Sequence, residues 1–70
     1  MSLEVGRIIG DARRAQGFSQ ARLAGIAGIS RRQLASIEAG ANTSIRVLQR
    51  LAEVLRIPEI PLGGSRASVS

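Results

Sequence analysis

Apolar residues recur at helical spacing along residues 4–16 of the chain. Four side chains follow the i, i+3, i+4, i+7 pattern of a helix that buries one face: Val5, Ile8, Ile9 and Ala12. Gly17 follows at a position suited to a left-handed residue, so the pattern predicts that the helix ends there. Gly6 and Gly10 lie inside this helix, and each would weaken it by about 1 kcal/mol relative to alanine if it faced solvent.

Two shorter helices are predicted next, each preceded by a serine that can cap it. Ser19 precedes a helix of about eight residues that ends at Gly28. Its predicted inner face consists of Leu23, Ile26 and Ala27. Ser30 precedes a third helix over about residues 31–39, which Gly40 ends. Two short helices joined by a glycine turn form a candidate helix-turn-helix.

A fourth helix is predicted before two prolines. Three residues can cap it: Asn42, Thr43 and Ser44. Its apolar positions again have helical spacing: Ile45, Leu48, Leu51, Ala52 and Leu55. Pro58 and Pro61 prevent a long helix beyond this point, because each lacks an N–H donor and restricts the residue before it.

The chain has room for one domain. No segment shows the alternating pattern of a strand, so we expect an all-α, four-helix bundle over residues 1–57. Residues 58–70 are expected to form a proline-bounded extended segment and a flexible tail.

The charge of the chain limits the kinds of partner that it is expected to bind. The 70 residues contain ten arginines, no lysine and five acids, a net charge of +5. This balance favours a polyanion, either nucleic acid or an anionic membrane surface, although arginine usage alone is also explained by a GC-rich genome. No stretch approaches the roughly 20 apolar residues of a membrane span, and the N-terminus lacks a signal-peptide pattern. We therefore expect a cytoplasmic protein with no membrane partner.

The residue types that are missing argue against an enzyme. The chain has no cysteine and no histidine, which removes disulfides, thiolate metal sites and the commonest general base. It also shows no phosphate-binding loop and no cluster of carboxylates. We expect no catalytic residue, no metal and no cofactor. The single phenylalanine argues against binding of single strands by base stacking.

The third helix separates its residues by role. At about 100° per residue, Leu34 and Ile37 share one face, while Arg32 and Ser36 each lie about 160° from Leu34. Arg31 is lateral, in the first turn. A helix that presents arginine, serine and alanine outward suits the major groove of DNA, where arginine binds guanine and the alanine methyl meets a thymine methyl. A merely solvated surface is the alternative interpretation of these arginines.

Glu38 requires a partner. It lies about 40° from Leu34, beside the predicted core, where an unpaired carboxylate is costly. Arg13 flanks the inner face of the first helix at the same angle from Ile9, about 40°. We predict a structural ion pair between Arg13 and Glu38 that ties the first helix to the third.

Four stretches of the chain together resemble the lambda-repressor-like (XRE) helix-turn-helix family: SQARLA at 19–24, GIS at 28–30, IEAG at 37–40 and LQRLAEVL at 48–55. The resemblance covers about residues 4–57. It implies binding to a palindromic DNA operator as a homodimer, usually for transcriptional repression. It also implies the ion pair between Arg13 and Glu38.

The resemblance also assigns roles to single positions. Three residues fall where the family contacts bases: Arg31, Arg32 and Ser36. Phosphate contacts are expected from residues at helix starts and in the loop before the fourth helix: Gln20, Ser30, Asn42, Thr43 and Arg46. Arg22 is added to these phosphate-binding candidates for its positive charge and not by the resemblance. The amide donors and positive dipole at helix starts favour the same role for Gln20, although a surface glutamine is more often only solvated.

The chain departs from the family in three places. Arg22 replaces a common acidic residue, so the capping box is lost and positive charge is gained. Ala39 and Ala41 stand where polar or basic residues are common, which removes phosphate donors. Pro58 and Pro61 leave little room for the fifth helix through which many members dimerise. A five-helix bundle remains the alternative fold, and the dimer surface stays open.

Two functions fit these observations. The first is a transcriptional regulator, a repressor that inserts the third helix into the major groove of double-stranded DNA. The second is an antitoxin or another protein-interaction module that binds a toxin or other partner through its C-terminal segment, either the stretch over residues 57–62 or the tail. Ile60 and Leu62 fit this function, but a hydrophobic latch onto a second subunit explains them equally well. Many antitoxins also bind DNA, so the two functions are compatible.

Overall fold

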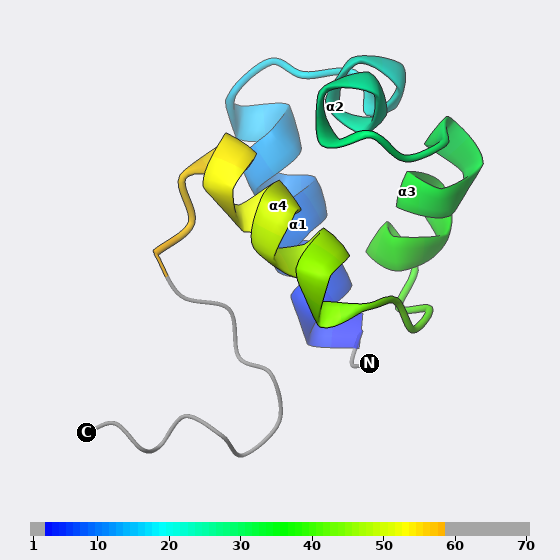
Figure 1. Cartoon of the computed structure of the whole chain (residues 1–70). Coiled ribbons are helices and arrows are strands. Elements are labelled where there is room, and N and C mark those ends of the chain that lie inside the picture. The colour runs from blue at the N-terminus through cyan, green and yellow to red at the C-terminus, as the bar shows by residue number, and fades with distance from the viewer. Residues whose placement is uncertain (1–2, 59–70) are drawn as a thin grey trace.

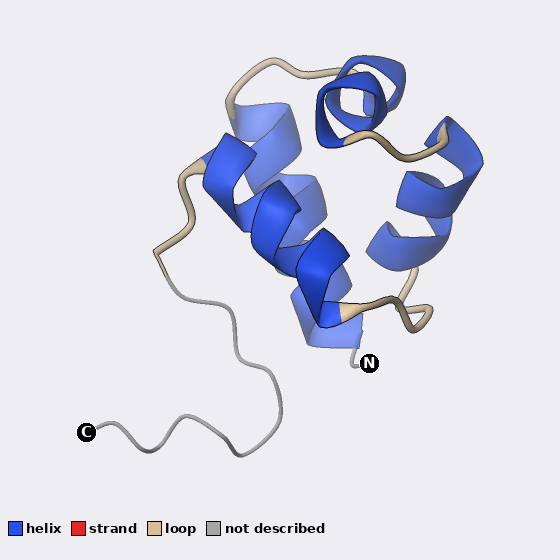
Figure 2. Ribbon diagram, viewed as in Figure 1, coloured by secondary structure: helices blue, strands red, loops and turns tan. Residues whose placement is uncertain are grey.

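The computed structural model describes residues 3–58, which form four helices and no strand (Figures 1 and 2). The helices are α1 (Leu3–Ala15), α2 (Gln20–Ala27), α3 (Arg31–Glu38) and α4 (Ile45–Leu55). The predicted all-α, four-helix architecture is confirmed. The predicted C-terminal segment and tail, including Ile60 and Leu62, lie outside the described residues apart from Pro58.

Serine residues start three of the helices. The Oγ atoms of Ser19, Ser30 and Ser44 each accept a hydrogen bond, at 3.0 to 3.1 Å, from the backbone N–H three residues later. Each bond satisfies one of the free donors at a helix start, and loss of such a cap costs about 1 kcal/mol. Of the three candidate caps for α4, Ser44 occupies the position.

The three glycines predicted to end helices all have positive φ angles. These angles are 80° at Gly17, where a left-handed residue was predicted, 77° at Gly28 and 104° at Gly40. The end of α4 lacks a glycine, and Arg56 takes the left-handed conformation instead, with a φ of 58°. Its N–H donates to the carbonyl of Glu53 and that of Ile57 donates to the carbonyl of Ala52, so the last turn is closed before Pro58.

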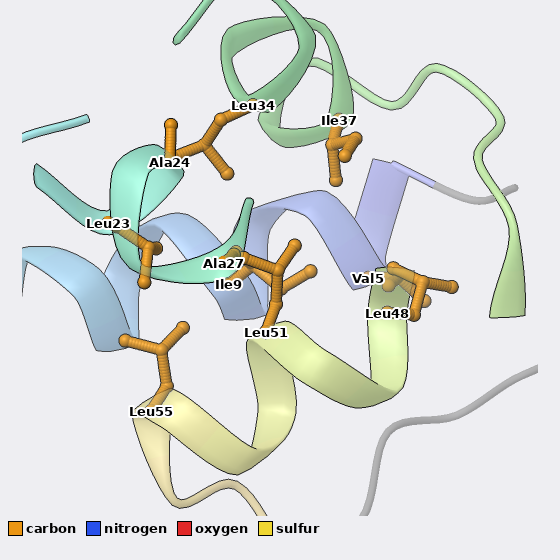
Figure 3. Packing of buried hydrophobic residues seen from close by; sticks show 10 residues of the cluster. All are labelled: Val5, Ile9, Leu23, Ala24, Ala27, Leu34, Ile37, Leu48, Leu51 and Leu55. Atoms are coloured by element: carbon orange, nitrogen blue, oxygen red, sulfur yellow. The ribbon is translucent and has the colours of Figure 1, made fainter. Parts of the chain in front are cut away.

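The core lies between the four helices, where ten buried side chains meet (Figure 3). They come from all four helices: Val5, Ile9, Leu23, Ala24, Ala27, Leu34, Ile37, Leu48, Leu51 and Leu55. Contacts run in a ring, in which α1 and α2 each pack against both α3 and α4. Each short helix is therefore held by two neighbours.

Two apolar residues predicted to face inward are exposed. Ile26 is 49% exposed, and Ala24 takes its place in the core. Ile26 lies about 60° from Leu23, on the side away from Ala24 and Ala27, so it stands at the edge of the buried face. Ile45 is 58% exposed because it is the first residue of α4, ahead of the turn that carries Leu48 into the core.

Gly6 and Gly10 do not face solvent but lie buried where α1 approaches the end of α3. The loss of about 1 kcal/mol per glycine was predicted only for glycines that face solvent, so it does not apply to Gly6 and Gly10. A Cβ on Gly6 would overlap the carbonyl oxygen of Ile37 and lie 2.7 Å from that of Glu38. The missing side chain thus lets α1 pack directly against the backbone of α3 and sets the position of that helix.

Candidate nucleic-acid interface

α3 has an apolar inner face and a polar outer face. Leu34 and Ile37 are 0% and 1% exposed and anchor the helix to the core. Arg31, Arg32 and Ser36 are exposed. The separation predicted from helical angles is therefore present, and the three candidate base-reading side chains lie on the outside of one eight-residue helix.

The turn before α3 fixes where this outer face points. The Gly28 N–H donates to the carbonyl of Gly25 at 3.3 Å, and the Ile29 N–H donates to that of Ala24 at 3.0 Å. These bonds satisfy carbonyls at the end of α2. Ile29 is half-buried against the core, so the chain re-enters the bundle before Ser30 starts α3.

The predicted phosphate-binding residues stand at helix starts and in the loop between α3 and α4: Gln20 and Arg22 on α2, Ser30 before α3, Asn42 and Thr43 in the loop, and Arg46 on α4. Gln20 and Thr43 are half-buried and the other four are exposed. A hydrogen bond from Gln20 to Glu38 places the start of α2 beside the end of α3. Gln20 therefore lies near the α3–α4 loop, whereas Ser30 lies at the opposite end of α3.

Arg50 brings a positive charge that helical spacing did not assign to the site. Its Nη1 atom lies 3.5 Å from the position that a Cβ would take on Gly28, so a side chain of α4 reaches the turn between α2 and α3. Arg50 also lines an open recess of about 250 Å³ on α4, together with Arg46, Gln49 and Glu53. No spacing rule links residues so far apart in the chain.

Arg13 joins three parts of the structure. Its Nε donates to Glu38 Oε2 at 2.7 Å, and its Nη2 donates to Glu38 Oε1 at 3.2 Å. Its Nη1 donates to the backbone carbonyl of Phe18 at 2.9 Å, in the loop between α1 and α2. Each side chain of the pair is only 11% exposed. The predicted ion pair is present, with the two-bond geometry that makes such pairs strong.

Gln20 is a third member of this network, which the sequence did not predict. Its Nε2 donates to Glu38 Oε1 at 3.2 Å. Gln20, which was expected either to contact a phosphate or only to be solvated, is thus bonded within the protein. Angles within a single helix could not predict this bond, because it depends on how close in space the start of α2 lies to the end of α3.

Within residues 3–58, no group of three or more metal-binding side chains comes together. No helix among these residues is both long and apolar enough to pass through a bilayer.

A family model described as helix-turn-helix matches residues 9–62, which is well over half of the chain. The chain belongs to the lambda-repressor-like (XRE) helix-turn-helix family. This family consists of DNA-binding transcription regulators, so the XRE assignment makes the outer face of α3 the candidate DNA contact surface. Comparison with curated proteins and with solved structures gives no match.

Proposed function

We propose that this XRE domain is a sequence-specific regulator, a repressor, that places α3 in the major groove of double-stranded DNA. The observation that carries the proposal is the division of α3, in which Leu34 and Ile37 are buried while Arg31, Arg32 and Ser36 are exposed. Each arginine can bind the O6 and N7 atoms of a guanine, and the serine hydroxyl can bond to several base edges. A bound domain of this kind represses by occupying its site.

Contacts to phosphates would set the register of α3 on the duplex. The exposed Arg22 on α2, Asn42 in the loop after α3 and Arg46 on α4 supply side-chain donors. Ser30 and Thr43 add hydroxyls, and the first turns of α2 and α4 add backbone N–H groups. Such contacts carry no base information but orient the protein.

We further propose that two copies bind a palindromic operator. The two α3 helices would then enter successive major grooves about 34 Å apart. The described residues do not include Ile60 and Leu62, on which the alternative function of an antitoxin depends. The DNA-binding proposal rests on described residues throughout.

Salt dependence tests the electrostatic part of the proposal. If a dimer neutralises about six to eight phosphates, its affinity for a duplex should fall by about three to four orders of magnitude between 50 and 200 mM salt. Fluorescence anisotropy with a labelled random-sequence duplex measures this slope. Arg46→Ala should make the slope shallower by about 0.9 for each phosphate that the variant no longer neutralises. Affinity that does not respond to salt would contradict the proposal.

Base reading by Arg32 makes a separate prediction. Arg32→Ala should lower the preference for one base pair in each half-site by about 1 to 3 kcal/mol, because the alanine can no longer bond to the base edge. Gln20→Ala should weaken binding to all sequences to a similar degree, since it acts on the backbone. Affinities for single-base-pair variants of the preferred duplex separate these outcomes. If Arg32→Ala keeps the full preference at every position, Arg32 does not contact bases.

A further inference from the structure

The Glu38 side chain links its partly buried ion pair with Arg13 to the start of α2. Its Oε1 atom accepts one hydrogen bond from Arg13 Nη2 and another from Gln20 Nε2, both at 3.2 Å. Glu38 is the last residue of α3 and Gln20 is the first residue of α2. One carboxylate oxygen therefore connects α1, α2 and α3 at the edge of the proposed DNA surface.

The chemistry of the carboxylate determines which way the Gln20 amide faces. An ionised carboxylate only accepts hydrogen bonds, so the NH₂ group of Gln20 must turn toward it and the carbonyl must turn away. One of the two N–H bonds is used by Glu38, and the second remains for another acceptor. A glutamine without this partner would sample many rotamers and both amide orientations, and binding would have to select one.

Backbone donors lie at the same place. The first intrahelical bond of α2 runs from the Leu23 N–H to the Ser19 carbonyl, and the Arg22 N–H is bonded to Ser19 Oγ. The N–H groups of Gln20 and Ala21 precede these bonds and have no partner within the helix. An acceptor at the start of α2 can therefore meet two backbone donors and the second Nε2–H of Gln20.

The ion pair also removes an electrostatic conflict. A lone carboxylate beside a phosphate-binding group would repel the phosphate. Arg13 bonds to both oxygens of Glu38, and each side chain is only 11% exposed, so the charge is neutralised where it arises. The Arg13–Glu38 pair as a whole is neutral, so it can accept the hydrogen bond from Gln20 without repelling a phosphate nearby.

We propose that Glu38, neutralised by Arg13, is a positioning residue that holds the Gln20 amide ready to donate to a DNA phosphate. This inference rests on the proposed function and assigns to the ion pair a role in binding as well as in stability. Because the amide is held before DNA arrives, less rotamer freedom is lost on binding.

Removing both charges together tests the proposal. The variant Arg13→Met with Glu38→Met keeps the net charge and leaves no unpaired buried ion, so it should remain folded. Its affinity for a random-sequence duplex should fall by up to about tenfold, because the free Gln20 side chain must then be ordered when the duplex binds. The salt slope should not change, because Gln20 carries no charge. Asp11→Met with Arg14→Met removes an exposed ion pair of α1 and should leave affinity unchanged.

Two further variants separate positioning from stability. Gln20→Ala should lower the affinity for the duplex about tenfold in the wild-type chain. In the chain with methionine at positions 13 and 38 it should change the affinity very little, because Glu38 no longer positions the Gln20 amide there. Arg13→Met with Glu38→Gln restores an uncharged acceptor oxygen at position 38 and should recover part of the affinity, because the amide at position 38 can also donate and therefore fixes the Gln20 amide less strictly than the carboxylate does. A melting curve of each variant checks that it is folded at the temperature of the titration.

Additive losses would overturn the proposal, as would wild-type affinity in a folded chain with both methionines. Failure of the wild-type chain to bind the duplex at all would instead overturn the proposed function. If the methionine chain does not fold, NMR of the wild-type chain still decides. One Nε2 proton of Gln20 should show a hydrogen-bonded shift in the free protein, and the other should shift when the duplex is added. If neither Gln20 proton responds to DNA, Gln20 does not meet a phosphate.

Discussion

Replacing Arg13 by alanine is expected to lower the free energy of unfolding by about 3 to 5 kcal/mol, because it leaves the Glu38 carboxylate buried without its cation. Arg13 makes three hydrogen bonds, two to Glu38 and one to the Phe18 carbonyl, and the pair is 11% exposed on each side. A domain of this size has a total stability of only a few kcal/mol. The variant should therefore be largely unfolded at 25 °C, as circular dichroism with urea or thermal denaturation can measure.

Arg14→Ala is the matched control for this substitution. Arg14 is the neighbouring residue, carries the same charge and also bonds to an acid, Asp11, at 2.6 Å. Its side chain is 59% exposed and that of Asp11 is 66% exposed, so the pair contributes less than about 1 kcal/mol. Equal melting temperatures for Arg13→Ala and the wild-type chain would show that the buried pair does not hold α1 to α3.

Gly6→Ala is expected to have the second largest effect, a loss of about 3 kcal/mol of stability from overpacking. The added methyl would meet the backbone carbonyls of Ile37 and Glu38, which cannot move aside as a flexible side chain would. Helix propensity alone would favour alanine by about 1 kcal/mol, so the expected sign is opposite to that of a solvent-facing glycine. Urea denaturation of the variant measures both sign and size.

Gly25 provides the comparison within the same chain. It lies in α2, is exposed, and has no atom within 4 Å of the position of an added Cβ. Gly25→Ala should therefore stabilise the domain by about 0.5 to 1 kcal/mol. If Gly6→Ala stabilised the domain as Gly25→Ala does, α1 would not approach the backbone of α3 as closely as described.

The features that local sequence determines could be predicted. Ser19, Ser30 and Ser44 cap their helices through bonds that span three residues, and Gly17 and Gly28 end theirs through their own conformation. The faces of α3 follow from helical geometry in the same way. The Arg13–Glu38 pair could also be anticipated, because a carboxylate beside the core requires a cation.

Features that depend on how the helices are placed could not be predicted from spacing. Ile26 and Ile45 fit the apolar pattern but lie at the edge or start of their helices, where only the neighbouring helices decide burial. The bond from Gln20 to Glu38 and the approach of Arg50 to Gly28 join residues that are distant in the chain. The glycines of α1 gave no sign of their role, because close packing against another backbone leaves no periodic pattern.

Selection of bound duplexes from a random library tests the central claim most directly. The full chain would be incubated with the library at fixed, moderate salt, and the retained DNA would be sequenced after several rounds. The division of α3 into buried Leu34 and Ile37 and exposed Arg31, Arg32 and Ser36 predicts enrichment of one consensus. The proposed binding of two copies predicts that this consensus consists of two inverted half-sites about one helical turn apart. A retained pool with the composition of the starting library would contradict sequence-specific binding through α3.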